Sequence, residues 1–119
     1  MNLKITLFAL ILLSPVISQA SSDEGMEAAE TLCSHLRHAS YRNRCLGHVS
    51  NADYFQINAV DVCDELTFEV KKVNCVRAIA DKTYSKIALK SCSTEVTDTL
   101  IVDCLRQSGR RVQSAGFEY

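Results

Sequence analysis

The chain has 119 residues, of which 47% are hydrophobic and 23% are charged. This length and composition indicate a single folded domain, and they exclude a disordered tail or a chain embedded throughout in a membrane. The 13 basic and 14 acidic residues give a net charge of −1, which argues against a polybasic protein that binds nucleic acid or membranes.

Residues 1–20 have the composition of a secretory signal peptide. One lysine precedes an apolar run over residues 5–13, and Ser18 and Ala20 are the small residues expected before a cleavage site. The apolar run is too short to cross a bilayer, which takes about 20 residues. We therefore expect a signal peptide over 1–20, a mature chain without a transmembrane segment, and a secreted or periplasmic location.

Six cysteines follow the leader in a regular pattern. In an oxidising compartment, an even number of cysteines indicates disulfide bonds. A Cys-x11-Cys motif occurs three times, and its first cysteines are 30 and then 29 residues apart: Cys33, Cys45, Cys63, Cys75, Cys92 and Cys104. A period of this length is typical of repeats made of two helices.

Each repeat is predicted to form a helix, a turn and a second helix. Apolar residues recur at helical spacing in both halves, as in the runs Phe55, Ala59, Val62, Cys63, Leu66 and Leu100, Ile101, Cys104, Leu105. Residues 67–70 alternate like a strand, but equivalent segments should share a structure, which favours a helix. The turns are expected near Ala39, Glu69 and Asp98.

Polar residues near the expected helix starts are candidate N-caps. For the first helices of the repeats these are Asp23, Asp53 and Thr83, and for the second helices they are Ser40, Thr67 and Thr97. Tyr54 and Tyr84 follow two of these caps directly, and we expect them to pack between neighbouring repeats.

A turn midway between the cysteines of each motif brings them to the same height on antiparallel helices. The alternative places both cysteines on one continuous helix, as in twin Cys-x9-Cys proteins, but 12 residues rotate by about 120° net and separate the two sulfurs. Disulfide bonding requires Cα atoms within about 7 Å, closer than the usual 8–10 Å between helices. Ala29, Ala59 and Ala88 leave room for this approach. Of the fifteen pairings, we expect Cys33–Cys45, Cys63–Cys75 and Cys92–Cys104.

The predicted fold class is all-α. It comprises three stacked, disulfide-linked helical hairpins, or six short helices, over residues 21–109. The units span about 23–52, 53–82 and 83–109. Residues 110–119 lack an amphipathic period and are expected to form a flexible C-terminal tail.

The repeat resembles that of small secreted cysteine-rich proteins built from helical hairpins. Residues 88–92 and 103–105, with their counterparts in the other two repeats, carry the resemblance. Similar Cys-x11-Cys-Leu units occur in exported proteins of predatory bacteria, and the likeness covers residues 23–109. It implies export and a solenoid-like fold, but no functional motif. The chain is also similar to tetratricopeptide solenoids, but it lacks their 34-residue period and their Trp, so their peptide-groove residues do not carry over.

Three histidines of the first repeat are the candidate metal ligands. His35 and His38 are three residues apart, and His48 lies on the expected partner helix, so a three-histidine site is conceivable. Ordinary surface histidines explain the pattern better, because the expected turn falls close to His38. We therefore expect neither a metal nor another cofactor.

The sequence contains no recognisable catalytic motif. It has no Cys-x-x-Cys, no Gly-x-Ser-x-Gly and no glycine-rich phosphate loop. Acidic pairs such as Asp61 with Asp64 fit a solvated helix face better than a glycosidase dyad. We do not expect an enzyme, and a hydrolase with an unrecognised site is the third interpretation of function.

Basic residues gather near the first two expected turns: Arg37, Arg42, Arg44, Lys71 and Lys72. Ordinary solvated loops are enough to explain such a cluster. The more specific interpretation is an electrostatic binding edge for a partner protein or a polyanion. Repeat arrays mostly bind, because stacking creates an extended surface. We therefore expect an exported, non-enzymatic protein that binds another protein or a cell-envelope component, and not nucleic acid. The alternative is a small secreted effector or enzyme inhibitor.

Overall fold

The computed structural model describes residues 20–112. In this range it contains six helices and two short strands: α1 (Ala20–Ser34), α2 (Ala39–Ser50), α3 (Ile57–Asp64), α4 (Glu69–Ile79), β1 (Lys82–Thr83), α5 (Lys86–Ser93), α6 (Asp98–Ser108) and β2 (Arg110–Arg111). The predicted all-α class is confirmed. None of these helices is long and apolar enough to cross a membrane. The predicted signal peptide, except its last residue, lies outside the described residues.

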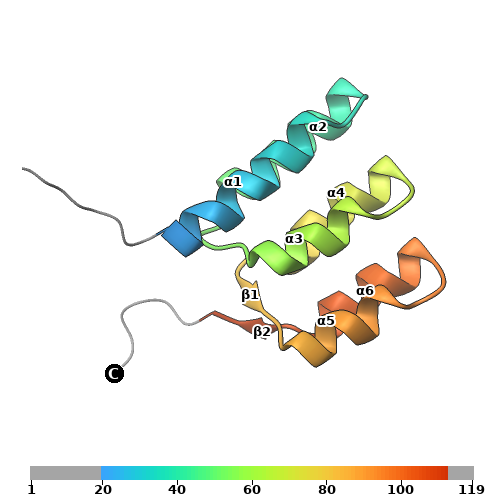
Figure 1. Cartoon of the computed structure of the whole chain (residues 1–119). Helices are drawn as coiled ribbons and strands as arrows, with labels where there is room; N and C mark the ends of the chain where they lie inside the picture. The colour runs from blue at the N-terminus through green and yellow to red at the C-terminus, as the bar shows by residue number, and fades with distance from the viewer. Residues whose placement is uncertain (1–19, 113–119) are drawn as a thin grey trace, which may run out of the picture.

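Consecutive helices form three antiparallel hairpins that stack in chain order (Figure 1). The odd-numbered helices lie side by side in one layer and the even-numbered helices in the other, with α3 touching α1 and α5, and α4 touching α2 and α6. All three turns therefore lie at one edge of the molecule, which we call the turn edge: residues 35–38, 65–68 and 94–97. The connections between hairpins lie at the opposite edge, which we call the base edge.

One disulfide joins the two helices of each hairpin. The bonds are Cys33–Cys45, Cys63–Cys75 and Cys92–Cys104, and their Cα atoms are 5.4, 5.5 and 5.3 Å apart. The predicted pairing is confirmed. Ala29 and Ala59 are fully buried one turn before the cysteines, as close helix packing requires.

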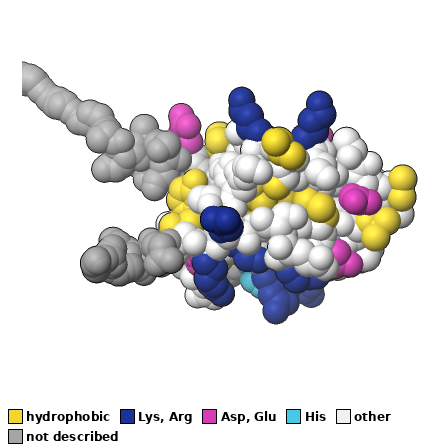
Figure 2. Space-filling model, turned by 90° about the horizontal axis from the view of Figure 1, so that it is seen from below, with side chains coloured by type: hydrophobic (Ala, Val, Ile, Leu, Met, Phe, Trp, Pro, Cys, Tyr) yellow, Lys and Arg dark blue, Asp and Glu magenta, His cyan; other side chains and the backbone are white. Residues whose placement is uncertain are grey.

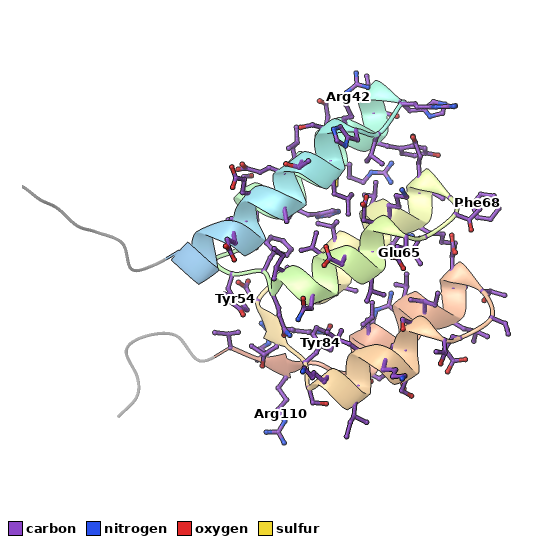
Figure 3. All side chains as sticks on the ribbon, viewed as in Figure 1. Arg42, Tyr54, Glu65, Phe68, Tyr84 and Arg110 are labelled. Carbon is purple, nitrogen blue, oxygen red and sulfur yellow. A yellow bond between two sulfur atoms is a disulfide. The ribbon has the colours of Figure 1, made fainter. Side chains whose placement is uncertain are left out.

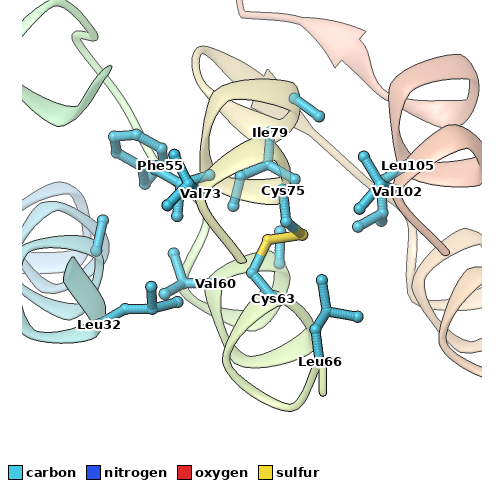
Figure 4. Packing of buried hydrophobic residues seen from close by; sticks show 14 of the residues in the cluster. Leu32, Phe55, Val60, Cys63, Leu66, Val73, Cys75, Ile79, Val102 and Leu105 are labelled. Carbon is cyan, nitrogen blue, oxygen red and sulfur yellow. A yellow bond between two sulfur atoms is a disulfide. The ribbon is translucent and has the colours of Figure 1, made fainter. Parts of the chain in front are cut away.

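The buried apolar residues form one continuous cluster that runs through all three hairpins. Figure 4 shows its central part, where Phe55, Val73 and Ile79 of the middle hairpin lie around the Cys63–Cys75 bond. These three side chains are fully buried. Among the described residues no polar or charged residue is buried, so the core is stabilised by apolar contact and by the disulfides.

At the base edge, one aspartate ties two connections together. Asp81 has φ 60°, a left-handed conformation that Asp tolerates better than most residues. Its Oδ1 accepts the backbone N–H groups of Asp53 and Tyr54 at 2.7 and 3.0 Å. Its backbone N–H donates to the Tyr54 carbonyl, and its carbonyl accepts from the Val112 N–H, both at 2.9 Å. Asp81 therefore links the first connection, the second connection and the residue that follows β2.

Two further side chains make hydrogen bonds at the base edge, one between the second and third hairpins and one within the third. The Gln56 side chain accepts from the backbone N–H of Tyr84 at 2.7 Å and donates to its carbonyl at 3.2 Å. The Tyr84 hydroxyl donates to the Leu105 carbonyl at 2.8 Å, and burial raises the pKa of Tyr84 to about 12. Tyr84 thus packs against the third hairpin, whereas Tyr54 is only half-buried.

Most of the predicted N-caps are wrong. Asp53 and Thr83 precede their helices by several residues, because their segments form the connections at the base edge, and Asp23 lies inside α1. The observed caps of α3 and α5 are Gln56 and Ser85. Ser40 and Thr67 are not caps either, since His38 and Phe68 precede α2 and α4. Thr97 is confirmed, because its Oγ1 accepts the N–H of Leu100.

The start of the predicted tail is ordered, contrary to the expectation of a flexible segment from residue 110. Arg110 and Arg111 form β2 and pair antiparallel with Thr83 and Lys82 of β1. The bond from Val112 to Asp81 extends this pairing by one residue. Residues 113–119 lie outside the described part of the chain.

The outer faces of the two terminal hairpins are more polar than the faces between hairpins. Leu36 and Leu66 are buried in the two hairpins that have a following neighbour, and the equivalent residue of the last hairpin is the exposed Glu95. Three other positions show the same change from a buried apolar residue to an exposed polar one on an outer face. On the last hairpin, Ser108 stands where the other two have Val49 and Ile79. On the first hairpin, Asn43 stands for Val73 and Val102, and Glu30 for Val60 and Leu89. Polar terminal units of this kind end a repeat array.

Candidate binding surface at the turn edge

A carboxylate at the start of α4 holds the first turn in place. The Glu69 carboxylate accepts the backbone N–H groups of Arg37 and His38 at 2.7 and 3.4 Å. Its Oε1 also lies 3.2 Å from Nδ1 of His38. These partners stabilise the charged form, and the Arg37 N–H has the largest effect, so the pKa of Glu69 lies below its ordinary value.

The same contact recurs one repeat later. Asp98, the first residue of α6, accepts the backbone N–H groups of Thr67 and Phe68 at 2.9 Å each. The equivalent first residue of α2 is Ala39, which has no carboxylate and no preceding hairpin to bind. Each following hairpin therefore fixes the turn of the hairpin before it, and the spacing of the first two turns is set by these contacts.

A cleft of about 500 Å³ opens between the first two turns. It is lined on one side by Arg37, His38 and Tyr41, and on the other by residues 67–70 and Lys72. The His38 and Tyr41 rings meet edge to face with centroids 5.3 Å apart. The cleft therefore combines aromatic surface with basic groups, a composition common in protein-binding sites.

Exposed apolar side chains lie on the second and third turns. Phe68 is 62% exposed and points outward from its turn, as Figure 3 shows. Val96 is 85% exposed, and Leu100 in the first turn of α6 is 44% exposed. In the view of Figure 2, apolar side chains reach the surface at the right-hand end, which is the end of the turns in Figure 1.

The predicted basic edge is brought together only in part. Arg37 and Lys72 line the cleft, although Lys72 also lies 3.9 Å from the Asp64 carboxylate. The Arg42 guanidinium donates to the carbonyls of Leu36 and Arg37, both at 2.9 Å, and so braces the first turn from within.

Two more of the predicted basic residues are outside the cleft. Arg44 lies over the Tyr41 ring, 5.7 Å from its centroid. Lys71 is half-buried and does not line the cleft. The cationic character of the turn edge is therefore carried mainly by Arg37, with Lys72 beside it.

The three histidines lie in three different surroundings. His35 lines a groove between α1 and α3 that also contains Glu24, Glu27, Asp61 and Asp64. His38 contacts Glu69, and His48 lies near Arg77 and Arg44. Burial, and then these two arginines, lower the pKa of His48. No group of three or more metal-ligating side chains is found within residues 20–112.

Tyr41, Phe68 and Glu69 are the turn-edge residues that sequence reasoning did not single out as binding residues. Glu69 and Asp98 occupy the same repeat position, 29 residues apart, so an acidic residue at a recurring position was the available signal. Phe68 carried no signal, because the residue at its position in the other repeats is His38 or Thr97.

Comparison with known proteins finds no matching family model, no matching curated protein and no matching solved structure.

Proposed function

We propose that this protein is an exported, non-enzymatic binding protein that contacts another protein or a cell-envelope component through the turn edge. The observation that carries the proposal is Phe68, a large aromatic side chain that is 62% exposed on a turn whose backbone N–H groups donate two hydrogen bonds to Asp98. Exposed aromatic residues on rigid supports often dominate binding energy.

Export is part of the same proposal. It is supported by the apolar leader over residues 1–20 and by the three disulfides, which persist in oxidising compartments. The resemblance to secreted helical-hairpin repeat proteins of predatory bacteria agrees with it. Mass spectrometry of the protein from its native source tests this step, since a mature chain that begins at Ser21 is expected.

The partner that we propose presents an apolar pocket beside acidic groups. Phe68 would enter the pocket, and Arg37 and Lys72 at the cleft would pair with the acidic groups, with Val96 and Leu100 adding apolar contact further along the turn edge. A secreted effector or enzyme inhibitor remains the alternative form of this function, and the identity of the partner decides between them.

Capture from a cell-envelope extract tests the proposal, with the oxidised protein as bait. Three baits are compared: the unchanged protein, Phe68→Ser on the turn edge, and Ile87→Ser on α5. Ile87 is a matched control because it is apolar and 81% exposed, near the base edge. We expect the unchanged protein and Ile87→Ser to retain the same partner and Phe68→Ser to lose it. Equal capture by all three baits would contradict the proposal.

A further inference from the structure

A second concave site lies at the base edge, away from the turns. This cavity of about 520 Å³ is lined by two kinds of residue: the uncharged Asn74, Ala78 and Ala80, and the basic Arg77, Lys82, Arg106 and Arg111. No acidic residue lines it. In Figure 2, Lys and Arg side chains gather along the lower edge of the molecule. We call this cavity the basic pocket.

The fold brings the four basic residues together from different elements. Arg77 and Arg106 lie in the last turns of α4 and α6, which pack side by side. Lys82 and Arg111 are direct partners in the β1–β2 pair. The Lys82 ammonium donates to the Arg106 carbonyl at 3.2 Å, which holds it near the end of α6.

This arrangement costs stability in the free protein. Like charges directly opposite each other on paired strands repel. Burial lowers the pKa of Lys82, and Arg111 and Arg106 lower it further. Arg106 has an acidic partner, Asp103, at 2.7 Å, whereas the described residues provide no ion pair for the other three basic groups.

Helix geometry explains most of the cluster, but not all of it. Cations are favoured near helix C-termini, which accounts for Arg77, for Arg106 and for the Lys82 ammonium at the Arg106 carbonyl. Arg111 lies on β2 opposite Lys82, where no helix dipole favours it. Groups that repel one another in the free protein, yet converge on one cavity, gain most from a ligand of opposite charge.

We propose that the basic pocket binds a phosphoryl group, either as free phosphate or as the phosphate of a lipid headgroup. A phosphomonoester carries a charge of about −1.5 to −2 and three acceptor oxygens, which match several converging donors better than a single carboxylate does. Guanidinium groups bind phosphate oxygens in pairs, and three of the four basic residues are arginines. A cavity of this volume holds a small phosphorylated group.

Titration with inorganic phosphate and with pyrophosphate, followed by NMR of the 15N-labelled protein, tests the proposal. We expect the signals of Asn74, Arg77 and Arg111 to shift with one common dissociation constant, and those of Lys86 and Lys90 on α5 to remain in place. The double variant Arg77→Gln/Arg111→Gln should weaken binding at least about tenfold.

The matched control is Lys86→Gln/Lys90→Gln, which removes two exposed positive charges outside the pocket. It should change the affinity by less than about twofold. Equal weakening of phosphate binding in both double variants would overturn the proposal. It would also be overturned if sodium chloride of equal ionic strength produced the same NMR shifts, or if the shifts did not saturate with phosphate. Arg77→Gln/Arg111→Gln removes a repulsion and is expected to fold. The single variant Arg111→Gln provides a second test, since it too should weaken phosphate binding.

Vesicles distinguish the two sources of the phosphoryl group. Sedimentation with phosphatidylcholine vesicles that contain phosphatidic acid is compared with sedimentation with pure phosphatidylcholine. Binding that requires phosphatidic acid, Arg77 and Arg111 supports a lipid headgroup, and binding of free phosphate alone supports a small soluble ligand. This inference is independent of the turn edge, because Phe68→Ser should leave phosphate binding unchanged.

Discussion

Two helical glycines meet opposite surroundings. A Cβ atom on Gly25 of α1 would overlap the Phe55 carbonyl oxygen, whereas a Cβ on Gly47 of α2 would meet nothing within 4 Å. The equivalent of Gly25 in the other repeats is Phe55 or Tyr84, both buried. The first repeat therefore needs a glycine here because α1 packs directly against the backbone that precedes α3.

This contrast predicts opposite effects of the same substitution. Gly25→Ala should lower the free energy of unfolding by about 1–3 kcal/mol, because the backbone of Phe55 must move. Gly47→Ala should raise it by about 1 kcal/mol, because alanine favours a helix and has free space. Thermal or urea unfolding measures both changes. A neutral Gly25→Ala variant would show that the α1–α3 contact is looser than the structure has it.

Glu69 predicts a pH dependence of stability. Because its pKa is lowered in the folded protein, the charged carboxylate stabilises the fold above its unfolded value of 4.5, and this contribution is lost as the pH falls through the lower folded pKa. Glu69→Ala should therefore lower Tm near neutral pH. The difference in Tm between this variant and the unchanged protein should become smaller in acid.

The control for this prediction is Glu65→Ala. Glu65 is exposed on the same turn as Phe68 (Figure 3). Its side chain accepts no hydrogen bond from another residue within residues 20–112. Thermal unfolding across the acid range, followed by circular dichroism, gives Tm for both variants. If Glu65→Ala and Glu69→Ala show the same pH profile, the hydrogen bonds to Arg37 and His38 do not contribute to stability.

At the scale of the hairpins, the three disulfides differ in their access to solvent. Cys104 is half-buried, whereas Cys33, Cys45, Cys63 and Cys75 are fully buried. Exchange requires a thiolate to reach a sulfur, so the Cys92–Cys104 bond should open first under limiting reductant. Alkylation followed by peptide mass spectrometry identifies the opened bond. Earlier labelling of either of the other pairs would contradict this order.

The local parts of each hairpin were predictable from the sequence, and the contacts between hairpins were not. Equal cysteine spacing and helical periodicity predicted turns near Ala39, Glu69 and Asp98, and the observed turns end just before these residues. The turns are not midway between the cysteines, because each first helix ends one residue after its cysteine. The strands β1 and β2 were missed, because two-residue strands leave no periodic signal and their partners, Lys82 with Arg111 and Thr83 with Arg110, are far apart in the sequence.

In the candidate binding surface, too, local features could be predicted from the sequence, whereas contacts between hairpins could not. Arg37 and Lys72 were predicted from local charge, but the approach of Arg37 to Phe68 depends on how the first and second hairpins stack. The carboxylate contacts of Glu69 and Asp98 join residues 30 to 32 positions apart. The basic pocket likewise combines α4, α6 and both strands, so periodicity within one repeat carried no information about it.

At the scale of the whole molecule, the polar end faces predict that the array stops at three hairpins. The double variant Glu95→Leu/Ser108→Ile restores to the last hairpin the residue types that Leu66 and Ile79 provide in the middle one. It should associate through the new apolar face in a concentration-dependent way, while the unchanged protein stays monomeric.

Sedimentation velocity measures this association. The control Glu27→Leu/Ser93→Ile makes the same two replacements at exposed positions of α1 and α5. It should remain monomeric, because these positions are exposed in every repeat, also where a neighbouring hairpin follows. Association of both variants to the same extent would show that added hydrophobicity alone, and not its place on the end face, causes the effect.

Each disulfide closes a separation of only 12 residues and joins consecutive cysteines. A chain that emerges from its N-terminus exposes both members of one pair before the first member of the next. On the export route that we propose, an oxidase acting during translocation can therefore form every native bond in order, without an isomerase to reshuffle wrong ones. Maturation of the protein should depend on a disulfide-forming enzyme and be insensitive to loss of the disulfide-correcting one.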